Sequence, residues 1–104
     1  MPMKKLSAVQ LKQQKAVLTA VEALEQLATA ELPGFVQGWF SLEYEAFPAS
    51  LLVRLQLVSD EAVALAQPQL LLWQKRLSAF MLKRGVILKD MRKHLVFTSQ
   101  GPED

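Results

Sequence analysis

Residues 42–57 read LEYEAFPASLLVRLQL and decide the fold of the middle of the chain, because apolar residues alternate with polar ones on both sides of a proline. A period of two is typical of strands with one buried face. We expect two antiparallel strands joined by a four-residue turn, since proline favours the first corner of a type I or II turn. The shared apolar face then pairs Tyr44 with Val53, and the outer face pairs Glu43 with Arg54.

The segment before this hairpin predicts a helix that begins at Ser7. Gln10 follows three residues later, which is the pattern of a capping box, where both side chains bond to backbone N–H groups. Apolar residues then recur at spacings of four, three and four, which places them on one face of a helix. They are Val17, Val21, Leu24 and Ala28. Lys12 and Lys15 fall on the opposite face, towards water, and Pro33-Gly34 ends the helix.

A second helical region follows the hairpin. Ser59 precedes two acidic residues, and acids are favoured near the positive end of a helix dipole. Pro68 has two interpretations, because it can kink one continuous helix or open a separate segment. Residues 69–83 carry a further apolar stripe, and Gly85 stands where a glycine commonly ends a helix.

Two short apolar runs, VIL at 86–88 and LVFT at 95–98, predict a second hairpin with a basic loop between them. The predicted order is therefore α-β-β-α-β-β. We expect one α+β domain over residues 1–104, with two helices packed on one face of a four-stranded, mainly antiparallel sheet. Residues 1–6 and 100–104 are expected to be frayed.

Composition excludes several classes of site. A chain of 104 residues without cysteine has no disulfide, no thiolate zinc site and no thiol nucleophile. The most apolar tract, 62–73, is interrupted by Gln67-Pro68-Gln69 and is shorter than the roughly 18 apolar residues that cross a membrane. We expect a cytoplasmic protein that uses no cofactor and no membrane.

No pattern of catalytic residues is evident. The single histidine, His94, follows the basic loop with no Ser or Cys nucleophile near it in sequence, and we interpret it as an exposed strand residue. Glu43 and Glu45 share a strand face with an arginine opposite, which is typical of a solvated sheet surface. The scattered glycines form neither a P-loop nor a dinucleotide fingerprint. The sequence therefore predicts a protein without catalytic activity.

The net charge of +2 is unevenly distributed, because residues 75–99 carry seven basic residues against one acid. The seven are Lys75, Arg76, Lys83, Arg84, Lys89, Arg92 and Lys93. If they converge, they form a cationic patch that neutralises phosphates, and its binding weakens steeply with salt. The leading hypothesis is a small binding protein for an acidic partner, nucleic acid or protein. The simpler interpretation is a charged surface that keeps the protein soluble.

Three large apolar residues support a second hypothesis. By the alternation, Trp39, Phe47 and Leu52 fall on the sheet face opposite Tyr44 and Val53, where helices on one face alone leave them in water. Such a face suits a partner protein or a homodimer. Trp39 has an alternative position before the strand, turned inward.

The pattern Tyr44-x-x-Phe47-Pro48-x-Ser50-Leu51, followed by an apolar strand, a helix and a short hairpin, resembles a family of small uncharacterised gammaproteobacterial proteins. The resemblance spans most of residues 35–99. Some members of that family are labelled Fis-like regulators, which implies a C-terminal helix-turn-helix, whereas 86–88 and 95–98 predict strands here. The resemblance implies no catalytic or binding residues for this chain.

Overall fold

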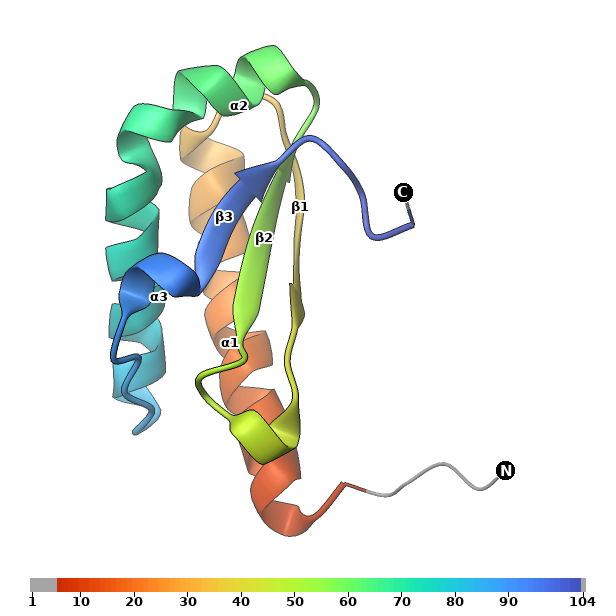
Figure 1. Ribbon diagram of the computed structural model, residues 1–104. Helices are drawn as coiled ribbons and strands as arrows, with labels where there is room; N and C mark the ends of the chain where they lie inside the picture. The colour runs from red at the N-terminus through yellow and green to blue at the C-terminus, as the bar shows by residue number, and fades with distance from the viewer. Residues whose placement is uncertain (1–5, 104) are drawn as a thin grey trace.

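Within residues 6–103, which the computed structural model describes, three α-helices and three strands form an α+β fold (Figure 1). Their bounds are α1 Ala8–Glu31, β1 Phe35–Ser41, β2 Leu52–Leu57, α2 Asp60–Ala66, α3 Leu70–Lys83 and β3 Leu95–Thr98. Single 3-10 turns lie between them as η1 Tyr44–Ala46, η2 Gln67–Gln69 and η3 Met91–Lys93. Of the ends that we expected to be frayed, residues 1–5 and 104 lie outside the described residues.

The long helix α1 begins and ends where local sequence signals predict. Ser7 Oγ accepts from the N–H of Gln10 at 3.1 Å, and Gln10 Oε1 accepts from the N–H of Ser7 at 3.0 Å, which confirms the capping box. The chain turns away at Gly34, whose φ of 79° lies in the left-handed region that glycine adopts at low cost. The predicted apolar stripe is buried.

β1 and β2 pair antiparallel, as predicted, but in another register. Val53 lies opposite Phe40 rather than Tyr44, a shift of four residues. Tyr44 belongs to η1, inside a longer connection, and Arg54 lies opposite Trp39. The predicted pairs are wrong because a shift by an even number leaves the apolar residues on the same face, so alternation cannot distinguish the two registers.

The predicted sheet is wrong in strand number and direction. Across residues 6–103 the sheet has three strands in the order β1-β2-β3 and is mixed, because β2 and β3 are parallel. A parallel pair requires a long crossover, and α2 and α3 supply it. Residues 86–88 form no strand. Their alternation reflects burial without strand pairing, since Leu88 packs in the core while Ile87 is exposed.

The crossover consists of two separate helices. Ser59 caps α2 with its hydroxyl, as predicted, and Pro68 lies in η2, so it opens a new segment instead of kinking one helix. Gly85 ends α3 with a φ of 79°. Its N–H and that of the next residue donate to the carbonyls of Leu82 and Met81 at 2.9 and 3.0 Å, which is a Schellman motif.

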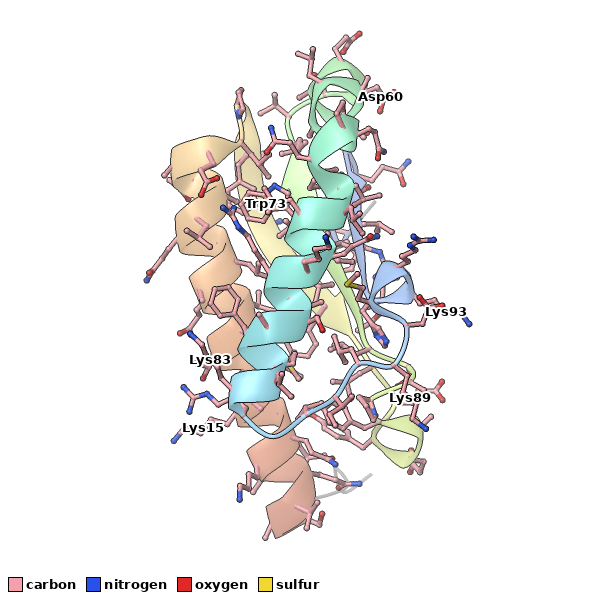
Figure 2. All side chains as sticks on the ribbon, turned by 90° about the vertical axis from the view of Figure 1, so that its left-hand side faces the viewer. Lys15, Asp60, Trp73, Lys83, Lys89 and Lys93 are labelled. Carbon is pink, nitrogen blue, oxygen red and sulfur yellow. The ribbon has the colours of Figure 1, made fainter. Side chains whose placement is uncertain are left out.

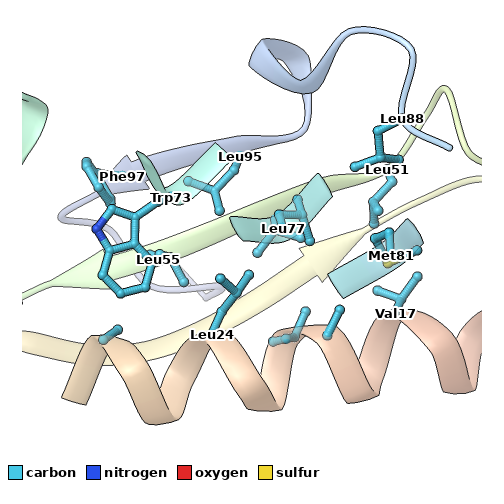
Figure 3. Close-up of a cluster of buried hydrophobic side chains, with 14 of the residues drawn as sticks. Val17, Leu24, Leu51, Leu55, Trp73, Leu77, Met81, Leu88, Leu95 and Phe97 are labelled. Atoms are coloured by element: carbon cyan, nitrogen blue, oxygen red, sulfur yellow. The ribbon is translucent and has the colours of Figure 1, made fainter. Parts of the chain in front are cut away.

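The core lies between the sheet and the two long helices (Figure 3). Large side chains with almost no exposed surface fill it, and they include Leu24, Leu51, Leu55, Trp73, Leu77, Met81 and Leu95. Each such side chain contributes about 1.5–3 kcal/mol by leaving water. Figure 1 shows α1 and α3 running in opposite directions on the same side of the sheet, so the start of α1 lies near the end of α3.

Two polar side chains are buried beside this core. Gln74 of α3 donates from Nε2 to the carbonyls of Arg92 at 3.2 Å and Leu95 at 3.1 Å. His94 is 4% exposed, so its prediction as an exposed residue is wrong. Its Nδ1 lies 2.7 Å from the carbonyl oxygen of Leu51, and this nitrogen donates because a carbonyl only accepts. Both side chains hold η3 and β3 in place.

No helix within residues 6–103 combines the length and the apolar character that crossing a membrane requires.

Candidate binding surfaces

The seven basic residues predicted as a patch occupy three places. One pair, Lys75 and Arg76, lies midway along α3, and another, Lys83 and Arg84, lies at its end. The remaining three lie in or before η3, and they are Lys89, Arg92 and Lys93. Figure 2 shows Lys83 on the side of α3 that faces α1, and Lys89 and Lys93 on the opposite side of α3. The seven therefore do not form one continuous patch.

Arg76 contacts two other side chains of the fold. Its Nη1 lies 3.1 Å from Glu31 Oε1, and its guanidinium carbon lies 4.7 Å from the centre of the Trp73 ring. Lys75, its neighbour in sequence, is exposed. The contacts of Arg76 join α3 to the end of α1, so this residue serves packing between helices rather than a free cationic surface.

Two cations that the sequence analysis placed towards water join the pair at the end of α3. Lys12 and Lys15 lie in the first half of α1 and line the same hollow as Arg84. They come together because α1 and α3 are antiparallel. The group of basic residues at the end of α3 therefore also includes two lysines of α1. The sequence pattern of α1 alone did not indicate this.

We call the end of the molecule that carries these cations the basic end. Its members are Lys12, Lys15, Lys83, Arg84 and Lys89, all of them exposed. Arg92 and Lys93 of η3 are exposed too, but they lie level with the middle of α3, where Gln74 contacts the Arg92 carbonyl. In Figure 2 Lys15, Lys83 and Lys89 lie in the lower half of the view and Lys93 near its middle, whereas Asp60 lies at the upper end. Acidic residues are present in this half of the molecule as well. Glu43 precedes η1, Glu45 lies within η1, and Asp90 precedes η3.

A groove of about 680 Å³ opens at the basic end, and we call it the end groove. The first half of α1 forms one wall with Val9, Lys12, Gln13, Lys15 and Ala16. Phe47 and Pro48, which are joined by a cis peptide bond, form the second wall. Residues 84–87, just after α3, form the third wall. Among these lining residues the charges are all positive.

The three apolar residues predicted as a protein interface do not share one surface. Phe47 packs against the core and lines the end groove, so its predicted place on the outer sheet face is wrong. Trp39 lies within β1 opposite Arg54, whose guanidinium carbon is 4.7 Å from the centre of the indole ring. Leu52 begins β2 on that same outer face, opposite Ser41. Trp39 and Leu52 are both half-buried.

Within residues 6–103, no group of three or more His, Cys, Asp or Glu side chains is placed to hold a metal ion. His94 uses its ring to hold the backbone before β2. A second, smaller hollow of about 360 Å³ lies beside Glu22, Glu25 and Phe35, away from the basic end.

No family model, no curated protein and no solved structure matches this chain.

Three kinds of residue at the end groove were not predicted from the sequence as part of a site. Lys12 and Lys15 were interpreted as an ordinary solvated face, and Val9 was not considered. Val86 and Ile87 were assigned to a strand. A spacing of three between the two lysines was visible in the sequence, but its relevance depends on which helix end lies beside α1.

Proposed function

We propose that the chain is a small non-catalytic binding protein that holds nucleic acid on its basic end. The observation that carries the proposal is that exposed cations from the start of α1, the end of α3 and the segment after α3 lie at the same end of the molecule. Lysine and arginine that neutralise phosphates release condensed counterions, which drives association without reading bases. A cytoplasmic location is part of this proposal.

The chemistry of the basic end favours contacts with phosphates over contacts with bases. Phe47 is the aromatic residue that lines the end groove, and it packs against the core. Sequence-tolerant stacking on single strands uses several exposed aromatic rings. Between residues 86 and 103 the chain has η3 and β3 but no α-helix, so we do not propose a helix-turn-helix mode of the Fis-like kind. We expect weak binding without sequence preference.

The test is the affinity of the full chain for a fluorescein-labelled RNA oligonucleotide of mixed sequence, measured by anisotropy while salt rises from about 50 to 200 mM. If four phosphates are contacted, the slope of log K against log salt is about −3, from ~0.7 per contact on a single strand. Binding that is absent at low salt, or that does not respond to salt, contradicts the proposal.

Single charge reversals provide a matched control on one helix. Arg84→Glu reverses a charge at the basic end, whereas Lys75→Glu reverses an exposed charge midway along α3. We expect Arg84→Glu to weaken RNA binding several-fold more than Lys75→Glu. Equal losses reject the basic end as the binding surface. Binding of polyglutamate without binding of RNA identifies an acidic protein as the partner class instead.

The outer sheet face supports a second candidate function, a homodimer or protein interface. The Nε1 of Trp39 is buried and has no hydrogen-bond partner among residues 6–103. Trp39 and Leu52 also bring large apolar side chains to the face opposite α1 and α3. Sedimentation of the protein at micromolar concentration tests this candidate, and a monomer at every concentration rejects the homodimer.

A further inference from the structure

We propose that the end groove binds one molecule of an amphipathic anion, a carboxylate or phosphate group carried on an apolar chain. This inference does not rest on nucleic-acid binding, because it depends on the apolar walls of the groove as well as on its charges. The ligand would place its chain against the apolar side chains and its anionic group beside the cations at the rim.

The walls of the groove are held in place by contacts that need no ligand. The Schellman motif at Gly85 fixes the path of residues 84–87. Phe47 packs against the core from the opposite wall, and Ala16 is a buried residue of α1. A pre-formed cavity binds with less loss of conformational entropy than one that must order on binding.

Apolar side chains on two of the walls remain in water. Val9 is 66% exposed and Ile87 is 68% exposed, although they face the same groove from α1 and from the segment after α3. Pro48 and Val86 add further apolar surface. An apolar chain lying between these side chains would remove both from water. This burial would stabilise the complex by roughly 25 cal/mol for each Å² of apolar surface.

The charged residues that line the groove favour a ligand with a negative charge. Lys12, Lys15 and Arg84 all line the groove, and no acidic residue does. A cationic or neutral amphiphile could use the same apolar surface but would gain nothing from these three side chains. Lysine and arginine also carry apolar stems, so they extend the apolar wall while their charged groups stay at its edge.

The size of the groove favours a single small molecule over a macromolecule. A volume of about 680 Å³ lies inside the range of roughly 300–1,000 Å³ that is usual for small-molecule sites. A stable protein interface covers about 800 Å² on each partner, which a groove lined by parts of three segments does not offer. A free amphiphile and a lipid in a bilayer share this chemistry, so the experiment separates them.

The probe is decanoate, kept below the concentration at which it forms micelles and added to the full chain. Decyltrimethylammonium is the matched cationic probe with the same chain length. Amide chemical shifts measured by NMR report both the affinity and the place of binding. We expect decanoate to shift amides of residues 9–16, 47–48 and 84–87, and to bind about tenfold more tightly than the cationic probe, a difference of ~1.4 kcal/mol.

Protein variants test the binding of the anionic group and of the apolar chain separately. Arg84→Glu should weaken decanoate binding about fivefold or more, whereas Lys89→Glu, across the basic end, should not change it. The double variant Val9→Ser/Ile87→Ser should weaken decanoate binding about fourfold for each ligand methylene that loses its apolar contact. Both side chains are mostly exposed, so these replacements leave the core intact. Leu65→Ser on α2 is the matched control, since Leu65 is 78% exposed and lies outside the groove.

Each other outcome overturns the proposal. Equal affinity for the two probes removes the role of the cations. Shifts spread over both ends of the molecule show that decanoate binds without a site. Sedimentation with phosphatidylglycerol vesicles, without binding of monomeric decanoate, points to a membrane surface instead. If the Val9 and Ile87 variant keeps decanoate binding but loses RNA binding, the groove serves the nucleic acid alone.

Discussion

At the residue scale, the amide of Gln74 joins α3 to the two segments that end the fold. It is 4% exposed and donates to two carbonyl groups, those of Arg92 and Leu95. Gln74→Met keeps the length of the side chain but leaves both carbonyls without this donor. We expect the free energy of unfolding to fall by about 1–3 kcal/mol, the cost of an unsatisfied buried polar group.

Denaturant unfolding measures this loss, and Gln67→Met is the matched control because Gln67 is exposed in η2. The control should change the free energy of unfolding by less than about 0.5 kcal/mol. Equal effects of the two substitutions would contradict the structural role of Gln74.

Arg76 and Lys75 are neighbours in sequence with different roles in the structure. Arg76 contacts both Glu31 and the Trp73 ring, whereas Lys75 is exposed on α3. We expect Arg76→Ala to lower the free energy of unfolding by about 1 kcal/mol, from a partly exposed ion pair and a cation–π contact. Lys75→Ala should have a smaller effect. Neither should change RNA affinity by much, and a large loss of affinity in Arg76→Ala would show that Arg76 belongs to the binding surface.

At the element scale, α1 and β1 are in close contact at Gly38. A Cβ on this residue would lie 3.0 Å from Glu25 Cγ and 3.3 Å from Leu55 Cδ2, and the Gly38 N–H donates to Glu25 Oε2 at 2.9 Å. Gly38→Val therefore requires the side chains of Glu25 and Leu55 to move. We expect a loss of about 1–3 kcal/mol in the free energy of unfolding, the usual cost of overpacking.

The neighbouring residue provides the control for this packing. Gln37 is exposed, and its side chain bonds only to Gln56 across the strands in the described contacts. Gln37→Val should change stability by less than about 0.5 kcal/mol. If thermal or denaturant unfolding shows Gly38→Val to be as harmless as Gln37→Val, the close approach of α1 to β1 is not the tight contact described.

Elements whose signals are local could be predicted, and elements defined by distant partners could not. The caps at Ser7 and Ser59 and the end of α3 at Gly85 each depend on a few adjacent residues, and all three are confirmed. The register of β1 depends on a partner strand, and registers four residues apart have the same alternation. Residues 86–88 alternate as a strand does, yet they have no strand to pair with.

The candidate site was predictable only in part for the same reason. The excess of bases at residues 75–93 is visible in sequence, but their separation into groups follows from η3 and from the turn after α3. Arg76 could not be distinguished from Lys75 without the position of Glu31. The lysines of α1 join the site only because α1 and α3 are antiparallel, a relation that no single segment encodes. The resemblance to the gammaproteobacterial family stays a prediction.

At the scale of the whole molecule, basic residues that are unevenly distributed along the sequence are also unevenly distributed between the two ends of the fold. The fold brings the start of α1, the end of α3 and Lys89 to the basic end, while Asp60 and Glu61 begin α2 at the other end. A net charge of +2 is small, so the field that a polyanion meets depends on this separation rather than on the total. An acidic partner should therefore approach the basic end first.

The most direct test of this account is an NMR titration of the full chain with RNA of mixed sequence at low salt. Chemical shifts should change at the amides of α1 residues 12–15, at Lys83 and Arg84, and at Lys89, while those of α2 stay in place. The changes should disappear as salt rises, because the contacts are with phosphates. Shifts centred on Trp39 and Leu52 of the outer sheet face, or no shifts at low salt, would contradict the assignment of binding to the basic end.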